Sequence, residues 1–588
     1  MNEQRNLILA IVLSMAVLVG WNYFFAPKPA APGAQPAQSA QPAPGTQTQT
    51  QVVRTLPRAA ALTQSPRAVI DTPTLDGSIN LTGGRFDDLK LRAYRETIDP
   101  KSPEIELLSP MASEHPYFAE FGWIAPQGST TPVPGPTTAW TLAAGDKLSP
   151  GHDVTLSYND GQGLIFTRHI FVDARYMFTI TDRVENRGAS PMVLYPYALV
   201  SRHNLPNVPH SWIVHEGFIG VANGALKDAS YADLAKNNDT QHFDSTGGWV
   251  GITDKFWMAA VVPPQGDFTG TYKAYDDNGI KAYQSDYLMK PRTVAPGGAQ
   301  EVTHRLFAGA KVVDILKDYR DHTGVQHFDL AVDWGWFWFI TQPMFVALDY
   351  LFRFVGNFGV AILIFTVFMK LLFFPLANTS YRAMSKMKKL QPEMERIRER
   401  FKDDRVQQQQ ATMELYKTER VNPLAGCLPM LIQIPVFFSL YKVLVVSIEM
   451  RHAPFFGWIR DLSAPDPTSL FNLFGLIPFT PPQFLMIGVL PLFFGMTMWV
   501  TTNLNPPAAD PTQAKIFAFM PLLMTYMLSA SPAGLVIYWT WSNLLSMAQQ
   551  MFIMHRTGTP IDLIDRLRGM GQRFRRGEPL EKPAGPPD

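Results

Sequence analysis

Cysteine and net charge are almost absent from this chain of 588 residues. Its single cysteine, Cys427, excludes an intrachain disulfide and a metal site made of cysteines alone. A formal net charge of +1 with 46% hydrophobic residues is not the composition of a nucleic-acid-binding protein or of a disordered chain. The sequence predicts no metal site and no cofactor, because scattered histidines of the central region, among them His152, His169, His203, His215 and His242, lack the spacing of metal ligands.

Motifs for catalysis and for driven transport are missing too. The chain has no G-x-x-x-x-G-K-[ST] phosphate loop and no serine motif with a partnering histidine. The long apolar segments after residue 355 carry no Asp, Glu or His in their hydrocarbon portions, although a proton-driven transporter normally needs such a group there. We therefore predict that the chain is not an enzyme and has no catalytic residues. A small-solute transporter or channel is kept as the alternative function.

Hydropathy divides the chain into membrane and soluble parts. The apolar run 7–25 is longer than the core of a signal peptide and ends in aromatic residues that suit the lipid headgroup region. We predict that residues 1–25 form a retained N-terminal transmembrane anchor. Residues 26–64 are rich in Pro, Ala and Gln without apolar periodicity, which is typical of a linker.

A large β domain is predicted for residues 65–325. Short segments with partial apolar alternation, such as 154–158, 164–172 and 177–186, are separated by Gly, Asn, Asp and Pro. Many such segments in a row indicate an antiparallel β-sandwich. The run 311–322 has a helical pattern and should lead the chain back to the membrane. If only this domain were active, the protein would be a sugar-binding envelope protein, which is a second alternative.

The rest of the chain has the composition of a polytopic α-helical membrane domain. Residues 334–355 are aromatic and amphipathic, with Asp349 and Arg353 one helical turn apart, and predict an interfacial helix. The core 356–555 should contain five transmembrane helices, which makes six with the N-terminal anchor. The predicted spans of the core are 356–376, 424–447, 484–502, 514–530 and 534–554.

Positive charge in the loops predicts the orientation of these helices. The loop 378–422 carries eleven Lys and Arg residues, and the tail 556–588 is also basic. Because short cytoplasmic loops are enriched in Lys and Arg, both segments should be cytoplasmic. By alternation the N-terminus is then cytoplasmic as well, and the β domain lies in the periplasm of a bacterium with two membranes. We predict a multi-pass protein of the bacterial inner membrane.

One ammonium, that of Lys370, interrupts the apolar run 359–377. A charge in hydrocarbon costs at least ~2.5–3.5 kcal/mol on insertion scales. The lysine stem could reach the cytoplasmic surface, or the ammonium could face a water-filled cavity that opens to the cytoplasm. Thr366 lies one turn earlier on the same helical face, but these two residues alone leave both explanations open.

The last span favours the cavity. Its polar residues recur on one face of the predicted helix, and Gln433 adds an amide within the span 424–447. Polar faces in lipid must turn toward one another or toward water. Hydrogen bonds between helices can satisfy the side chains of Ser and Asn, but they do not compensate an ammonium that has no acidic partner. The polar face of the last span consists of Trp539, Ser542, Asn543, Ser546, Gln549 and Gln550.

The basic loop 378–422 predicts a cytoplasmic hairpin of two helices, with breaks at Gln391-Pro392 and around Asp403-Asp404. Methionines are spread along it, and their flexible side chains suit varied apolar partners. An ordinary solvated hairpin fits the same pattern. The residues that we predict to contact a substrate or the ribosome are Met384, Met387, Lys388, Lys389 and Met394.

Four segments carry a resemblance to a known family. The segment VNPLAGCLPMLIQIPVFFSLYKVL (421–444), with LQPEMERIRERF before it and RHAPFFGWIRDLS after it, resembles the YidC membrane-protein insertases. So does the segment 509–550, and the likeness extends over residues 334–555 almost continuously. The resemblance implies a protein that inserts and helps fold membrane proteins, alone or with the Sec translocon, through a hydrophilic groove open to cytoplasm and lipid. It also implies a periplasmic β-sandwich similar to carbohydrate-binding folds.

The resemblance assigns roles to residues and partners. Lys370 stands at the position of the family's groove cation, which is more often Arg, so the charge is kept but the bidentate fork is lost. Lys442 looks unusual for the family, and we expect it to reach the outer interface. The implied partners are nascent membrane proteins, the Sec translocon and its accessory subunits, the ribosome, the signal-recognition-particle receptor and the lipid bilayer, without sequence-specific nucleic acid. The predicted groove residues are Lys370, Thr366, Gln433, Tyr538, Trp539, Ser542 and Asn543.

Overall fold

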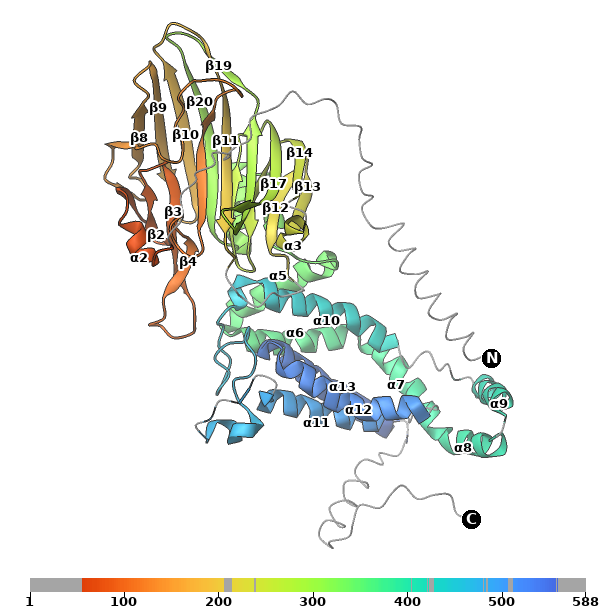
Figure 1. Cartoon of the computed structure of the whole chain (residues 1–588). Coiled ribbons are helices and arrows are strands. Elements are labelled where there is room, and N and C mark those ends of the chain that lie inside the picture. Colours follow the sequence, from red (N-terminus) through yellow and green to blue (C-terminus); the bar gives the residue numbers. More distant parts are fainter. Residues whose placement is uncertain are drawn as a thin grey trace.

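The computed structural model has a β domain at one end and a helical domain at the other (Figure 1). The predicted anchor 1–25, most of the predicted linker and nearly all of the tail 556–588 lie outside the residues that the structure describes. The described residues are 55–205, 214–236, 239–402, 404–419, 421, 428–477, 479, 481–482, 485–505, 511–556 and 558.

Two packed sheets form the β domain. Within the described residues, the larger has eleven strands in the order β14-β17-β18-β11-β5-β3-β2-β1-β7, with β19 beside β11 and β4 beside β3. Apart from the parallel pair β1–β7, its strands pair antiparallel. Its strands are β1 (Arg67–Asp71), β2 (Leu75–Asn80), β3 (Arg85–Arg95), β4 (Glu104–Leu108), β5 (Tyr117–Ile124), β7 (Lys147–Leu148), β11 (Met192–His203), β14 (Thr240–Thr246), β17 (Asp267–Asp277), β18 (Ile280–Met289) and β19 (Arg292–Val294).

The second sheet has nine strands in the described residues, in the order β13-β12-β15-β16-β20-β10-β9-β8-β6, all paired antiparallel. The predicted strands 164–172 and 177–186 coincide with β9 and β10, and burial alternates along both. The antiparallel sandwich is confirmed. Its strands are β6 (Thr141–Ala144), β8 (Val154–Asn159), β9 (Leu164–Val172), β10 (Met177–Asn186), β12 (Gly217–Ala222), β13 (Ala225–Ser230), β15 (Gly248–Thr253), β16 (Trp257–Val262) and β20 (Ala299–Ala310).

A buried arginine joins the two sheets. Arg168 of β9 is 1% exposed, and its guanidinium donates two hydrogen bonds to the Asp182 carboxylate of β10, at 2.6 and 2.9 Å. The same guanidinium donates to two carbonyl oxygens of the larger sheet. They are those of Gly84, directly before β3, and Phe121 of β5, at 3.0 and 2.6 Å. Four hydrogen bonds and one opposite charge compensate the desolvation of this cation.

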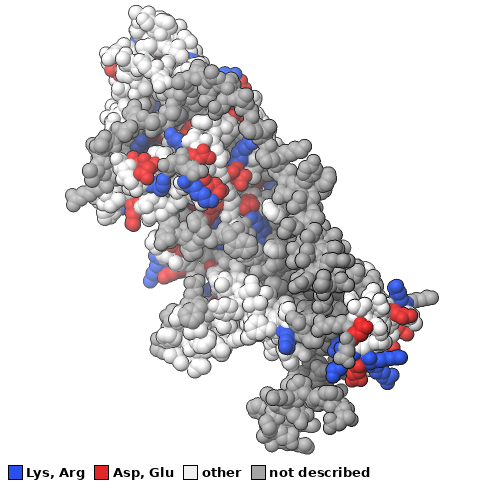
Figure 2. Space-filling model, turned by 45° about the vertical axis from the view of Figure 1, so that its right-hand side comes forward, with Lys and Arg blue, Asp and Glu red and all other residues white. Residues whose placement is uncertain are grey.

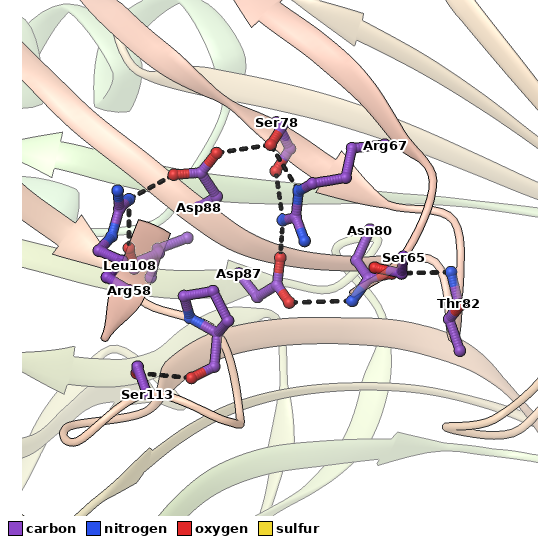
Figure 3. Close-up of polar contacts among 11 residues, drawn as sticks. Arg58, Ser65, Arg67, Ser78, Asn80, Thr82, Asp87, Asp88, Leu108 and Ser113 are labelled. Atoms are coloured by element: carbon purple, nitrogen blue, oxygen red, sulfur yellow. Dashed lines mark hydrogen bonds and ion pairs between the residues drawn. The ribbon is translucent and has the colours of Figure 1, made fainter. Parts of the chain in front are cut away.

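A second polar network ties the start of the domain to β3 (Figure 3). Arg58 pairs with Asp88, Arg67 pairs with Asp87, and Ser78 bridges the two pairs by accepting from Arg67 and donating to Asp88. Arg58 belongs to the short helix α2 (Arg58–Leu62). The segment 55–64, predicted as linker, is therefore part of the β domain, because the Arg58 charge is held by a buried carboxylate of that domain.

Helices form most of the described chain after residue 311, with irregular segments between them. The predicted helix 311–322 is α4, which begins two residues later and ends one residue later. The four spans predicted after residue 423 correspond to α10, α11, α12 and α13. The helices are α3 (Tyr231–Ala235), α4 (Val313–Thr323), η1 (Phe328–Ala331), α5 (Trp338–Val355), α6 (Phe358–Leu372), α7 (Phe374–Lys389), α8 (Gln391–Arg400), α9 (Arg405–Thr418), α10 (Leu428–Val446), η3 (Ile448–Met450), η4 (Leu470–Gly475), α11 (Val489–Leu504), α12 (Pro511–Ser529) and α13 (Ala533–Arg556).

A sharp bend separates α6 from α7. The two helices meet at 67° after Leu372, and Pro375 lies in the first turn of α7, where its missing N–H costs no helical hydrogen bond. In the described part of the chain, no single helix is both long and apolar enough to cross a bilayer, whereas α6 and α7 reach that length together. The predicted count of six spans remains a prediction.

The predicted two-helix hairpin 378–422 is instead three helices. Its first part belongs to α7, and the hairpin proper is α8 packed against α9, where the Tyr416 hydroxyl lies 3.4 Å from the Met394 sulfur. The break at Gln391-Pro392 is as predicted, because α8 begins with these residues. Figure 2 shows charged side chains on the β domain and on the end of the molecule that carries α8 and α9, with few on the white part of the helical domain between them.

Helix α5 has the amphipathic character that the sequence predicts. Met344, Phe345 and Leu348 are buried on the face of α5 that packs in the protein interior. On the opposite face, Tyr350 and Phe354 are 73% and 84% exposed. The exposed face is therefore aromatic and suits the headgroup region of a bilayer. The predicted pair of Asp349 and Arg353 is also present, at 2.8 Å.

The outer end of α10, next to the β domain, makes polar contacts with it. Lys442 Nζ donates to the Asp333 carboxylate at 2.6 Å, and only 8% of Lys442 is exposed. The expected extension of Lys442 to the outer interface stays a prediction, and the structure adds an acidic partner, Asp333, at this end of α10. Arg451 donates to the carbonyl oxygen of Arg95 at 2.6 Å, and Glu449 accepts from the backbone N–H of Val313 at 3.2 Å.

The Glu449 carboxyl, at the contact between the end of α10 and the β domain, makes the stability of the fold depend on pH. Burial raises the pKa of its carboxyl to about 7. Between pH 4.5 and 7 the folded chain keeps a proton that the unfolded chain releases, so this group makes stability fall as the pH rises. We expect Glu449→Gln to match the wild type near pH 4.5 and to be more stable above pH 7 by roughly 1–3 kcal/mol. Thermal unfolding of the full chain in detergent from pH 4.5 to 8 measures the difference.

The matched control for this prediction is Glu301→Gln, a change at an exposed position of β20. Its unfolding curve should stay parallel to that of the wild type at every pH. If Glu449→Gln also runs parallel to the wild type, the buried Glu449 carboxyl does not carry the pH dependence.

Candidate functional site

A cavity of about 390 Å³ lies within the helical domain, where α6, α7, α10, α11 and α13 meet. All seven predicted groove residues line it. Its polar lining is made of one ammonium, hydroxyls, amides and an indole, and its described lining contains no carboxylate, imidazole or thiol. The lining residues are Thr366, Met369, Lys370, Phe373, Leu376, Ala377, Tyr381, Gln433, Ile434, Val436, Phe437, Phe438, Met498, Tyr538, Trp539, Ser542, Asn543, Ser546 and Gln549.

Lys370 lies in the last turn of α6, immediately before the bend. Its half-buried ammonium donates to the Ser546 hydroxyl of α13 at 2.7 Å. No ion pair of Lys370 is found among the described residues. An ammonium has three donors, so a single hydroxyl partner leaves donors that can be directed into the cavity.

Two amides and a phenol extend the polar wall across three helices. Gln433 of α10 donates to the Tyr538 hydroxyl of α13 at 2.7 Å, and Tyr538 is buried. Asn543, one turn further along α13, is 3.4 Å from the Thr497 hydroxyl of α11. These hydrogen bonds hold α10, α11 and α13 around the cavity, and they satisfy polar groups that lipid cannot satisfy.

Trp539 and Thr366 contribute differently from the other predicted residues. The Trp539 ring packs between those of Phe437 and Phe494, with centroids 4.5 and 5.3 Å away, so it forms an aromatic wall. The Thr366 hydroxyl donates to the Ile362 carbonyl of its own helix at 2.7 Å. Its oxygen can still accept a hydrogen bond from the cavity side.

Tyr381, Ser546 and Gln549 are the polar lining residues that the predicted groove set lacks. Tyr381 lies on α7, which the sequence assigns to the hairpin beyond the membrane. The signal for it is present, because Lys370, Phe373, Ala377 and Tyr381 follow one helical face across the bend. Ser546 belongs to the polar face noted on the last span, but only the structure identifies it as the partner of Lys370.

The predicted contact residues of the hairpin do not line the cavity. Met384, Met387 and Lys388 lie half-buried on α7, beyond the cavity, and Lys389 is exposed at its end. Met394 lies on α8 against Tyr416 of α9. The structure therefore separates this group from the groove residues.

The outside of the helical domain is apolar. Large hydrophobic side chains are exposed on α6, α10, α11 and α12, as on a surface that contacts lipid rather than water. The cavity reaches this surface beside α10, because two of its lining residues are themselves almost half exposed. The exposed residues include Phe368, Leu371 and Leu372 of α6, Ile434 and Phe438 of α10, Met496 of α11, and Ile516, Phe519, Leu522 and Met527 of α12.

An apolar helical domain that encloses a polar cavity, joined to a large all-β domain, is the architecture of a membrane protein with a soluble β domain. Family models agree with this division. The model described as "YidC periplasmic domain" matches residues 67–347, and the model described as "60Kd inner membrane protein" matches residues 350–559.

Similar proteins are known along the whole chain. The chain is 50% identical to the membrane protein insertase YidC of Sinorhizobium fredii, over 97% of this chain and 98% of that protein. It is 49% identical to that of Brucella suis, over 97% and 99%. A crystal structure described as an active YidC insertase is 16% identical, over 92% of this chain and 98% of that one, with a TM-score of 0.36. The chain belongs to the YidC family of membrane protein insertases.

Membership confirms the resemblance stated from the sequence, and with it a bacterial inner-membrane protein with a periplasmic domain. Relatives of this kind are insertases and not enzymes, which agrees with the absence of catalytic motifs.

Proposed function

We propose that this chain inserts membrane proteins by receiving their polar segments in the cavity around Lys370. The observation that carries the proposal is the position of this ammonium. It lies on the wall of a polar cavity within an otherwise apolar helical domain, and Ser546 holds it there. A charged side chain within an apolar membrane segment is costly and is found where function requires it.

The cavity lowers the cost of moving a polar tail into the membrane. A polar group transferred to an apolar medium without hydrogen bonds loses several kcal/mol. Lys370, Gln433, Ser542 and Asn543 supply donors and acceptors along the path, and water in the cavity supplies the rest. An acidic tail gains in addition from attraction to the ammonium, and its outward movement is aided by the membrane potential at ~2.3 kcal/mol per charge per 100 mV.

The apolar part of the substrate leaves sideways into lipid. Ile434 and Phe438 of α10 line the cavity and are also exposed, so the apolar segment can slide along α10 and the exposed face of α12. Burial of its apolar surface in lipid drives this step. No nucleotide is consumed.

Topology and partners belong to the same proposal. The chain spans the inner membrane six times with both termini in the cytoplasm, and α5 lies at the periplasmic interface. The helices α7 to α9, with Met384, Met387, Lys388, Lys389 and Met394, receive the nascent chain, the ribosome and the signal-recognition-particle receptor on the cytoplasmic side. The Sec translocon and its accessory subunits act beside the chain. The support is the basic composition of this end and its distance from the β domain (Figure 1).

Depletion of the chain tests the proposal. Insertion of a small substrate with two spans and an acidic tail should stop on depletion and return with the full chain. If the chain were a small-solute transporter or channel, depletion would abolish an ion-coupled flux and leave insertion unchanged. If it were a sugar-binding envelope protein, residues 65–320 alone would be sufficient for its activity. Either result would overturn the proposed function.

A further inference from the structure

The groove helix α10 is fastened to the β domain at its outer end. Lys442 lies four residues before the end of the helix, and its ammonium pairs with Asp333, in the segment that joins the β domain to α5. The Asp333 carboxylate also accepts from the backbone N–H groups of His215 and Gly335, each at 3.0 Å. One carboxylate thus joins α10, the segment before β12 and the turn before α5.

The turn around Gly335 is shaped to the lysine stem. Gly335 has a φ of +72°, a conformation that side chains rarely adopt. A Cβ at this position would lie 3.3 Å from the Cε of Lys442 and 3.6 Å from its Cδ. The backbone therefore passes close along the lysine side chain, and the ion pair is built into the fold rather than formed by two loose surface groups.

Two further contacts reinforce the same end of α10. The Arg451 guanidinium lies 5.1 Å from the centroid of the Trp257 ring of β16 and donates to the Arg95 carbonyl at the end of β3. Glu449 accepts from the first backbone N–H of α4. Within ten residues, α10 and the turn after it contact four separate parts of the β domain and its connection to α5.

The inner half of α10 is held differently. Pro435 lies inside the helix and cannot donate the backbone hydrogen bond to the preceding turn, which weakens the helix at that point. Gln433 and Ile434, just before the proline, line the cavity, and Ile434 is 46% exposed. Gln433 is about 13 Å from Lys442 along the helix axis.

We infer that the Lys442–Asp333 pair fixes the outer part of α10 to the β domain, so that Pro435 is the hinge about which the inner part, with the cavity-lining residues Gln433 and Ile434, moves. The inference rests on the proposed function, because this movement opens the cavity to the lipid for a substrate segment. It makes Lys442 and Asp333 positioning residues, which act through α10 and not by touching the substrate.

The test uses the full chain in membranes and compares Lys442→Met with Lys442→Arg. Methionine keeps the stem and removes the charge, whereas arginine keeps the pair. We expect Lys442→Met to raise amide hydrogen exchange of residues 436–446 at least tenfold and to slow insertion of the two-span substrate several-fold. Lys442→Arg should match the wild type in amide exchange and in insertion rate. The thermal midpoint of the β domain should be unchanged in both variants.

Arg353→Gln is the matched control, because it removes an exposed ion pair of α5 with Asp314 of α4. It should leave exchange in α10 and insertion unchanged. Equal exchange in Lys442→Met and the wild type would overturn the inference, as would a general loss of β-domain stability. If Lys442→Met is not recovered from membranes, Arg451→Gln is measured against the same criteria. Failure of the wild type to insert the substrate would instead overturn the proposed function.

Discussion

Lys370→Glu should abolish insertion of substrates with acidic tails, while Lys370→Arg should keep at least half of the wild-type rate. The reversed charge would repel the tail inside a cavity where screening by salt is weak. Arginine keeps the charge and can still donate to the Ser546 hydroxyl of α13. The rate of insertion of a two-span substrate with an acidic tail, measured at equal amounts of each variant in the membrane, gives the comparison.

A substrate with a neutral tail is the control for this prediction. It should be inserted by Lys370→Glu at a reduced but measurable rate, because the remaining polar wall of Gln433, Ser542 and Asn543 is intact. Equal rates for Lys370→Arg and Lys370→Glu with the acidic tail would contradict an electrostatic role of position 370.

Arg168→Met should destabilise the β domain by ~3–5 kcal/mol, which is the usual cost of leaving one partner of a buried ion pair without the other. The Asp182 carboxylate would remain buried, and the Gly84 and Phe121 carbonyls would lose their donor. For a domain of this size the loss lowers the melting temperature by roughly 6–20 °C. Thermal unfolding of the full chain in detergent, followed by the circular-dichroism signal of β structure, measures it.

Two variants separate the buried charge from other effects of this substitution. Arg187→Met removes an exposed pair with Glu185 and should change the midpoint little. The double variant Arg168→Met with Asp182→Leu should recover part of the loss, because no unpaired charge remains. If the double variant is less stable than Arg168→Met, the pair itself and not the uncompensated carboxylate carries the stability.

Local periodicity explains why much of the fold could be predicted. Strands β9 and β10 coincide with the predicted ranges because each has one face in the sandwich core, so apolar and polar residues alternate. The break before α8 was predictable from Gln391-Pro392, since proline is favoured in the first turn of a helix. The bend after Leu372 was not predictable. A proline such as Pro375 can mark the end of a membrane span or the first turn of a new helix, and the sequence does not distinguish the two.

The grouping of the cavity-lining residues was predictable for the same reason, and the contact between α10 and the β domain was not. Lys370 with Thr366, and Tyr538 to Asn543, lie on continuous faces of single helices, so their grouping is visible in the sequence. The pairing of Lys442 with Asp333, 109 residues apart, depends on how the β domain sits on α10. No local pattern encodes such a contact, and Lys442 was therefore predicted to reach the interface.

Labelling of single cysteines at positions 370 and 546, in a Cys427→Ser background that still inserts substrate, measures most directly whether water fills the cavity. A membrane-impermeant thiol reagent added from the cytoplasmic side should modify both positions at least ten times faster than a cysteine at Phe368 or Leu371, whose side chains are about 60% exposed on the outside of the helical domain. Equal rates at all four positions, or no labelling at 370 and 546, would contradict a hydrated cavity around Lys370.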